Sequence, residues 1–244
     1  MPHPKSVPRE PDVITPESIA AVDHAITSRR SIRRFLTKPV PRELIDEILQ
    51  VASRSPSGSN TQPWRVHVLT GASRQGLVDK IMAAYNDPAQ AAQHKTEEGY
   101  YPAKWEPPYA DRRRQVGLDL YGLLEIGREE KARMHEQQGR NYAFFDAPVG
   151  LIFTIDRRLG RGSWMDCGMF QQTLMMAARA RGLDTCPQAA FNQYHCIVSA
   201  HLGLNEETEM VVVGMALGYA DLDAIDNTLL SDREPVSGFA RFLD

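Results

Sequence analysis

The sequence predicts one domain of mixed α and β structure. Several segments repeat apolar residues at helical spacing, and their number is too large for an all-β sandwich. Residues 149–155 form an apolar run without alternation, which is typical of a strand buried on both faces. A Gly-x-Gly-x-x-Gly fingerprint after a strand, a P-loop and a Gly-x-Ser-x-Gly elbow are all absent from the sequence. Periodicity therefore indicates mixed α and β structure, and the missing glycine motif argues against a dinucleotide-binding fold of the common type.

Composition supports a water-soluble chain of 244 residues, with 42% hydrophobic and 24% charged residues. A net charge of −3 gives no reason to expect binding to nucleic acid or membranes. Residues 1–12 are polar and proline-rich and lack the apolar segment of a signal peptide. We expect a flexible tail over 1–12, a single domain over 13–244 and a cytoplasmic protein.

The chain has three cysteines, Cys167, Cys186 and Cys196, and this odd, sparse set fits a reducing compartment and not a disulfide framework. Their spacing relative to His195 and His201 matches no closed zinc site. We therefore expect no metal and interpret the cysteines as small residues that are buried or half-buried.

In the first third of the chain, Thr15 should cap a helix that begins with Pro16 and repeats Ile19, Val22 and Ile26. A second helix is expected over residues 42–52, and a strand over 65–70 has Val66 and Val68 on one side. The loop between them contains prolines and several hydroxyl and amide side chains, and Trp64 should anchor it as a buried residue. Ser73 is expected to cap a short helix that carries Leu77 and Ile81.

The middle of the chain predicts an excursion over residues 85–145. Residues 85–109 look irregular, with four prolines and the aromatic residues Tyr100, Tyr101, Trp105 and Tyr109. A loop of this length is usually functional, and two interpretations remain open: a lid, or a cover over a neighbouring subunit. A helix should follow over 111–138, hinged near Gly127.

The last third predicts a helix over 163–181, capped by Ser163 and stopped by Gly182, whose methionines we interpret as core. Strands are expected over 149–155, 183–188 and 210–217, and a helix over 192–202 that Gly203 ends. The tail, 235–244, carries Phe239, Phe242 and Leu243, which need a surface to pack on, either in the same domain or on a partner subunit.

Two motifs, residues 29–35 (Arg-Arg-Ser-Ile-Arg-Arg-Phe) and 55–64 (Ser-Pro-Ser-Gly-Ser-Asn-Thr-Gln-Pro-Trp), resemble the flavin-binding segments of the FMN-dependent nitroreductase family, of the oxygen-insensitive NAD(P)H type. The similarity continues through 166–182, 186–191, 210–218 and Arg233-x-Pro235. It implies an α+β fold in which helices flank a central, mostly antiparallel sheet. It also implies an interlocked homodimer with an exchanged C-terminal arm over 235–244.

The resemblance assigns the FMN phosphate to Arg29, Arg30 and Ser31, joined by Arg233 from the C-terminal part of the chain. Arginine offers a fixed fork of donors that suits a phosphate. Judged without the resemblance, Arg-Arg-Ser near a helix end is more often solvated surface, and consecutive residues must converge to share one ligand. We expect Arg30→Ala to weaken FMN binding more than tenfold, from the worth of charge-assisted hydrogen bonds.

By the same resemblance, Arg33 approaches N1 and O2 of the flavin ring and stabilises negative charge there. The backbone N–H of Ala190 is expected to face flavin N5, and the resemblance implies a catalytic role for both Arg33 and Ala190. The remaining implied cofactor contacts are Pro56, Ser57, Gly58, Ser59 and Asn60, which reach the flavin of the opposite subunit, and Asn141, Gln188 and Ala189. Many members have Glu-Gly in place of Ala189-Ala190, so a carboxylate near the substrate is lost. Candidate substrate contacts are Trp105, Tyr109 and Tyr121.

The implied activity is reduction of nitroaromatic compounds by NAD(P)H, NADPH being favoured, through tightly but non-covalently bound FMN. One shared site implies ping-pong kinetics with hydride transfer through N5. Partners are a second copy of the chain, with the FMN sites at the subunit interface, and small nitroaromatic substrates. The alternatives are an enzyme of the same fold acting on quinones, flavins or halogenated aromatics, a flavin-binding protein without turnover, and a structural dimer without cofactor.

Overall fold

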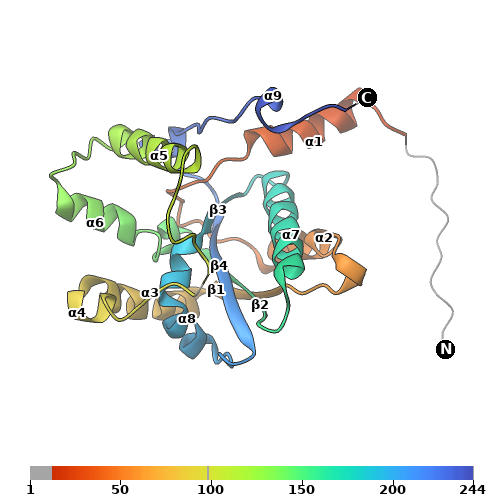
Figure 1. The fold of residues 1–244 in the computed structure, drawn as a ribbon. Coiled ribbons are helices and arrows are strands. Elements are labelled where there is room, and N and C mark those ends of the chain that lie inside the picture. Colours follow the sequence, from red (N-terminus) through yellow and green to blue (C-terminus); the bar gives the residue numbers. More distant parts are fainter. Residues whose placement is uncertain (1–12, 98, 244) are drawn as a thin grey trace, which may run out of the picture.

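A four-stranded sheet forms the centre of the computed structural model, which describes residues 13–97 and 99–243 (Figure 1). Its strand order is β1 (Arg65–Thr70), β2 (Val149–Asp156), β4 (Glu209–Gly218) and β3 (Asp184–Gln188), and all three neighbouring pairs are antiparallel. This confirms the expected α+β arrangement. The tail predicted over 1–12 lies outside the described residues.

Helices cover both faces of this sheet, as Figure 1 shows. α2 (Arg42–Ala52) and α7 (Arg161–Arg179) pack on one face, and α3 (Gly71–Asn86) and α8 (His195–Leu202) on the other. Successive side chains of a strand point to opposite faces, so β2 sends Leu151 and Phe153 to the α2–α7 side and Ile152 to the α3–α8 side. Both faces of β2 are buried, as its continuous apolar sequence predicts.

A β-bulge in β4 changes which face its residues occupy. Phe153 pairs with Val213 and Thr154 with Val211, so Val212 is left without an opposite residue. Before the bulge Val211 packs with the α3–α8 cluster, and after it Val213 packs with the α2–α7 cluster. The extra residue thus keeps both halves of a long strand buried with the correct side chains inward.

Several helix boundaries follow the sequence signals. α1 (Pro16–Ser28) begins with a capping box in which Thr15 Oγ1 accepts a hydrogen bond from the Ser18 N–H (3.2 Å). α5 (Tyr109–Leu123) and α6 (Lys131–Gly139) are separate, which confirms the hinge near Gly127. Gly203 ends α8 in the left-handed conformation (φ 67°) and Gly182 (φ 74°) follows α7.

Two predicted caps are wrong. Thr70 occupies the N-cap position of α3 without a side-chain hydrogen bond, and the helix runs from Gly71 to Asn86, so Ser73 lies inside its first turn. α7 is preceded by Gly160 and begins at Arg161, two residues before Ser163. A serine resembles a cap in sequence, but the N-cap residue is the one at which the backbone turns into the helix, and here that residue is extended in both cases. The region expected to be irregular from residue 85 therefore starts after α3, and it includes the short α4 (Pro88–Ala91).

Short helical turns complete the chain: η1 (Gly58–Asn60), η2 (Phe144–Asp146), η3 (Ala189–Tyr194), η4 (Ile225–Thr228) and α9 (Val236–Phe239). The helix expected over 192–202 therefore starts as the 3-10 turn η3 and becomes α-helical only at His195. Among the described residues, helices long and apolar enough to cross a membrane are absent.

Several large apolar side chains are exposed on the single chain. Phe239, Phe242 and Leu243 of the C-terminal segment are 71%, 86% and 77% exposed. Ile19, Val22 and Ile26 of α1 are exposed as well. Met165 and Met169 of α7 are exposed, which corrects the expectation that the methionines of this helix all belong to the core. The exposed set indicates surface that one copy of the chain leaves uncovered.

Candidate functional site

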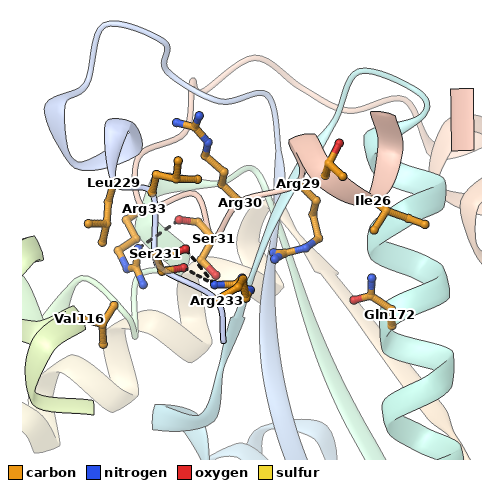
Figure 2. A pocket seen from close by; sticks show the side chains of 12 residues that line it. Ile26, Arg29, Arg30, Ser31, Arg33, Val116, Gln172, Leu229, Ser231 and Arg233 are labelled. Carbon is orange, nitrogen blue, oxygen red and sulfur yellow. Dashed lines mark hydrogen bonds between the residues drawn. The ribbon is translucent and has the colours of Figure 1, made fainter. Parts of the chain in front are cut away.

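A cavity of about 440 Å³ lies where α1 ends and the C-terminal segment returns (Figure 2). We call it the arginine cavity, and its described lining residues are Ile26, Thr27, Arg29, Arg30, Ser31, Arg33, Val116, Gln172, Leu229, Leu230, Ser231 and Arg233. Four of these lining residues are arginines, and the described lining contains no acidic residue. Guanidinium groups gathered without counter-charge form a site suited to a multiply charged anion.

Extended backbone after α1 decides which side chains enter the arginine cavity. Ser31 forms a parallel bridge with Thr185 of β3, and the Ile32 N–H donates to the Thr185 carbonyl (3.1 Å). Alternate residues of an extended segment point the same way, so Arg29, Ser31 and Arg33 share one side. Figure 2 shows the Arg29 guanidinium directed into the cavity and that of Arg30 extending away from it.

The guanidinium groups of Arg29 and Arg30 therefore do not converge. Both would have to point to the same place if they held one phosphate together, as expected from the sequence. Its Nη1 donates to the Thr228 carbonyl oxygen (3.4 Å), and the residue also lines a second hollow beside Arg179 and Asp184. Arg30 thus borders the arginine cavity at its edge.

Arg233 reaches the arginine cavity from the other end of the chain. Its Nη1 donates to Ser231 Oγ (2.8 Å) and to the carbonyl oxygens of Ser231 (3.1 Å) and Asp232 (2.8 Å). Figure 2 shows Arg29 and Arg233 pointing toward one another across the space beside Ser31. Two basic clusters separated by about the whole chain therefore line one cavity. Ser231, two residues before Arg233, completes the site and was not predicted.

Asn227 fixes the backbone that presents these side chains. Its Oδ1 accepts from the N–H groups of Arg33 (2.7 Å) and Arg34 (3.1 Å), and its Nδ2 donates to the Arg34 carbonyl (2.7 Å). The neighbouring buried Asp226 pairs with Arg140 (3.1 Å). The η4 turn therefore holds residues 33–34 against the sheet. No local sequence motif predicts this role.

A small hollow of about 90 Å³ continues from the arginine cavity, because Arg33 lines both. Its other described lining residues are Leu120, Tyr121, Gln137, Gln138, Asn141 and Phe145. The Arg33 Nη1 donates to the Ser31 carbonyl (3.2 Å), which keeps the guanidinium between the two spaces. Two predicted residues, Tyr121 and Asn141, are here. The predicted contact Gln188 is buried beneath them, where its Nε2 donates to the Asn141 carbonyl (2.5 Å).

A third space of about 320 Å³, the aromatic cavity, joins the small hollow at Gln138. Its described lining residues are Thr96, Tyr101, Trp105, Arg113, Gln138, Tyr142, Ala189, Ala190 and Gln193. Burial raises the pKa of Tyr142, with smaller contributions from neighbouring tyrosines, so its hydroxyl stays neutral near pH 7. Ala189, Ala190 and Trp105 occupy this cavity as predicted residues, whereas Tyr109 is 62% exposed and lies outside its lining.

The loop residues Pro56, Ser57, Gly58, Ser59 and Asn60 line none of these three cavities. Two hydrogen bonds nevertheless fix the backbone of this loop: the Gly58 N–H donates to Asp166 Oδ1 on α7 (3.2 Å), and the Gln62 N–H donates to Ser57 Oγ (3.0 Å). Ser59 and Asn60 have positive φ (50° and 59°). Trp64, predicted to be a buried anchor, is half-buried and stacks on Phe170 with ring centroids 4.7 Å apart.

The cysteines and their neighbours form no site that we assign. Cys167 and Cys186 are buried, but Cys196 is exposed, which corrects the expectation for that residue. His195, Cys196 and Glu206 place possible ligand atoms within 4.8 Å of one another. The imidazole of His195 already has a carboxylate partner, Glu97 Oε1 at 3.4 Å, and a closed zinc site needs a fourth ligand.

The chain matches the family model described as "Nitroreductase family" over residues 26–219. It is 43% identical to a 4-nitrobenzoate reductase of Pseudomonas putida, over 91% of this chain and 95% of that protein. It is 42% identical to a chloronitrobenzene nitroreductase of Comamonas testosteroni, over 91% and 96%. The solved structure of the FMN and NADPH-dependent nitroreductase NfnB from Sphigopyxis sp. strain HMH superposes with a TM-score of 0.87 at 34% identity, covering 91% of this chain and 99% of that one. From its sequence and its fold, the chain belongs to the nitroreductase family.

Proposed function

We propose that this protein binds FMN and reduces nitroaromatic compounds with electrons from NAD(P)H, NADPH being the favoured donor. The observation that carries the proposal is the arginine cavity, a cationic site with no acidic residue in the part of its lining that the structure describes. It continues through Arg33 and Gln138 into the aromatic cavity. The Pseudomonas and Comamonas relatives are named for nitroaromatic substrates, and the Sphigopyxis enzyme is described as FMN and NADPH-dependent.

Arg29, Ser31 and Arg233 would hold the FMN phosphate. A phosphate monoester carries about two negative charges near neutral pH and accepts several hydrogen bonds at once. Guanidinium groups from two distant segments, with a serine hydroxyl between them, supply charge and donors together. Arg30 contributes a more distant positive charge from the cavity edge.

Arg33 and Asn141 would lie along the cofactor between its phosphate and its ring. Arg33 is fixed by the Asn227 hydrogen bond to its backbone and by its own bond to the Ser31 carbonyl. A held cation beside the ring stabilises negative charge where it develops, without rearranging water. When bound, FMN supplies the two-electron chemistry that links NAD(P)H to the nitro group.

The aromatic cavity would receive the nicotinamide and the nitroaromatic in turn. Ala190 would direct its backbone N–H to flavin N5, with Ala189 and Gln188 shaping the same turn, while Trp105 and Tyr121 flank the substrate side. Tyr101 and Tyr142 add flat apolar walls that exclude water from the reacting groups. Tyr109 would meet substrate only if its exposed ring folds over the cavity mouth.

The active assembly would be a homodimer. The exposed apolar residues of α1, α7 and the C-terminal segment supply the surface, and the arm over 235–243 would cross to the partner. The loop from Pro56 to Asn60, held by Asp166, would reach the cofactor of the other subunit. Each site would then require both copies of the chain.

A visible spectrum tests the whole proposal. The purified protein, incubated with FMN and then desalted, should retain a yellow cofactor at about one per chain. Anaerobic NADPH should bleach the flavin absorbance, and a nitroaromatic should restore it. A colourless desalted protein would refute FMN binding, whereas bound flavin that NADPH fails to bleach would establish a flavin-binding protein without turnover.

A further inference from the structure

Three consecutive arginines on α5 have different surroundings. Arg112 pairs with Glu234 (2.5 Å) and Arg114 with Asp111 (3.0 Å). Arg113, between them, pairs with no carboxylate among the described residues and lines the aromatic cavity instead. Its guanidinium carbon lies 5.5 Å from the centre of the Trp105 ring, a cation–π arrangement that holds it on the cavity wall.

Arg113 is the charged residue of a lining that is otherwise neutral. The remaining described lining residues are three aromatic, two amide, two alanine and one threonine side chains: Tyr101, Trp105, Tyr142, Gln138, Gln193, Ala189, Ala190 and Thr96. Burial raises the pKa of Tyr101, and the charge of Arg113 opposes that rise, so the two side chains interact. The cavity therefore offers flat walls for one aromatic ring and one positive charge for a substituent on it.

We propose that Arg113 binds a carboxylate on the aromatic acceptor, so that nitroaromatic acids are preferred over uncharged nitroarenes. The inference rests on the proposed function, because Ala190, assigned there to the flavin, lines the same cavity. A guanidinium meets a carboxylate with two parallel hydrogen bonds, and the cation–π contact with Trp105 keeps the Arg113 guanidinium at the cavity wall beforehand. Ala189 and Ala190 place no negative charge that would repel an acid. A ring held by its carboxylate at Arg113 extends into the cavity toward these alanines.

Binding to the oxidised, FMN-loaded protein tests this without turnover. Benzoate and its neutral counterpart benzamide are titrated by calorimetry into the wild type, Arg113→Gln, Arg113→Lys and the matched control Arg114→Gln. We expect Arg113→Gln to raise the Kd of benzoate by about tenfold or more, from the worth of a charged hydrogen bond. Arg113→Lys should lie between, since lysine keeps the charge but loses the fork. Benzamide binding and the Arg114→Gln protein should match the wild type.

Steady-state kinetics with 4-nitrobenzoate and its methyl ester give the second measurement. In Arg113→Gln, kcat/KM for the acid should fall about tenfold because its KM rises. The kcat/KM for the ester and the KM of NADPH should change little. Equal losses for acid and ester would overturn the inference, as would unchanged benzoate affinity. A rise confined to the KM of NADPH would assign Arg113 to a donor phosphate instead and would also overturn it. If even the wild type reduced no nitro compound, the proposed function would fail, and the benzoate titration would still decide the role of Arg113.

Discussion

Alternation along residues 29–33 determines which side chains can hold a phosphate. Arg29, Ser31 and Arg33 face the arginine cavity together, whereas Arg30 donates to the Thr228 carbonyl. Consecutive arginines look equivalent in sequence. The extended backbone bonded to β3 makes them different, because each step of one residue reverses the side-chain direction.

The first prediction ranks the arginines. Arg29→Ala and Arg233→Ala should each weaken FMN binding by about tenfold or more, because each removes charge-assisted hydrogen bonds to the phosphate. Arg30→Ala, the matched control from the same segment, should weaken FMN binding less than either, because Arg30 donates to the Thr228 carbonyl; this replaces the loss of more than tenfold expected from the sequence. Quenching of FMN fluorescence on titration with each apo protein measures the affinities. A larger loss in Arg30→Ala than in Arg29→Ala would contradict the ranking.

The second prediction concerns Cys186, which is buried beneath Ser31 and Arg33. Burial raises the pKa of its thiol to about 11, with Arg33 opposing the rise. The thiol ionises more readily in the unfolded chain, so its contribution to stability is complete below pH 9 and is lost as the pH rises toward 11.

Urea unfolding at pH 8 and pH 10.5 measures this effect. Between these values the free energy of unfolding should fall by roughly 1–2 kcal/mol more in the wild type than in Cys186→Ala, since one pKa unit corresponds to about 1.4 kcal/mol. Tyr85, whose pKa burial raises to about 12, stays in both proteins and cancels from the comparison. Equal slopes in the two proteins would show that Cys186 does not titrate differently on folding.

Residues with strong chemical character could be predicted from the sequence, whereas residues that act through their position in the fold could not. Arg29, Ser31, Arg33 and Arg233 were predicted, and they line one cavity. Asn227 was missed, because a buried asparagine whose side chain bonds four backbone groups has no local pattern. Arg113 was missed because its neighbours are arginines too, and only tertiary contacts distinguish the three.

Among the elements, two buried glycines allow β2 and β4 to approach an aromatic cluster. A Cβ on Gly214 would lie 2.3 Å from Cδ2 of Phe191, and one on Gly150 would lie 2.5 Å from Cζ of Phe144. The Phe144 and Phe191 rings stack with centroids 4.6 Å apart, and both are fully buried. Phe191 directly follows Ala190, so the sheet surface supports the turn of the proposed N5 contact.

The third prediction follows from this packing. Gly214→Ala should lower the free energy of unfolding by about 1–3 kcal/mol, because neither the strand backbone nor the buried Phe191 ring can move aside easily. Gly122→Ala, at an exposed helical position with no atom within 4 Å of the added carbon, should leave stability unchanged or raise it by up to about 1 kcal/mol. Equilibrium urea unfolding of both variants provides the measurement. The same small loss in both would mean that Phe191 yields to the added methyl group.

Elements with continuous physical signals were predicted best. The α2 helix has one apolar face, β2 is apolar throughout, and both were placed correctly from the sequence. The β-bulge at Val212 was not predicted, because an apolar run looks the same whether or not one residue leaves the ladder. The starts of α3 and α7 were misplaced, because Ser73 and Ser163 mimic caps that the backbone places at Thr70 and Gly160.

For the molecule as a whole, exposed apolar surface concentrates on α1, α7 and the C-terminal segment. Such surface is unusual on a monomer when it includes Phe239, Phe242 and Leu243 together. In the proposed homodimer, methionine and aromatic side chains that look like core in the sequence would lie in the interface. An apolar residue has the same appearance in the sequence whether it packs inside its own domain or against a second copy, so the exposure of Met165 and Met169 could not be predicted.

The fourth prediction tests the dimer. Removal of residues 235–244 should shift the protein from dimer toward monomer and lower its thermal midpoint by several degrees, because the deleted side chains would lose their partner surface. Sedimentation velocity over a range of concentrations reports the assembly. Removal of residues 1–12 serves as the control and should change neither quantity. A full-length protein that sediments as a monomer would refute the homodimer.

The crowding of like charges around the arginine cavity has a consequence for the protein before it acquires its cofactor. Four guanidinium groups border one space, and its lining contains no acidic side chain from residues 13–97 and 99–243. These like charges repel one another in the apoprotein, and a bound dianion would cancel that repulsion. Ligand-free molecules should therefore melt earlier and should scavenge free phosphate or sulfate from their surroundings. In a cell, the supply of the proposed FMN cofactor would then govern how long newly made polypeptide survives proteolysis, as well as the rate of the proposed nitroaromatic reduction.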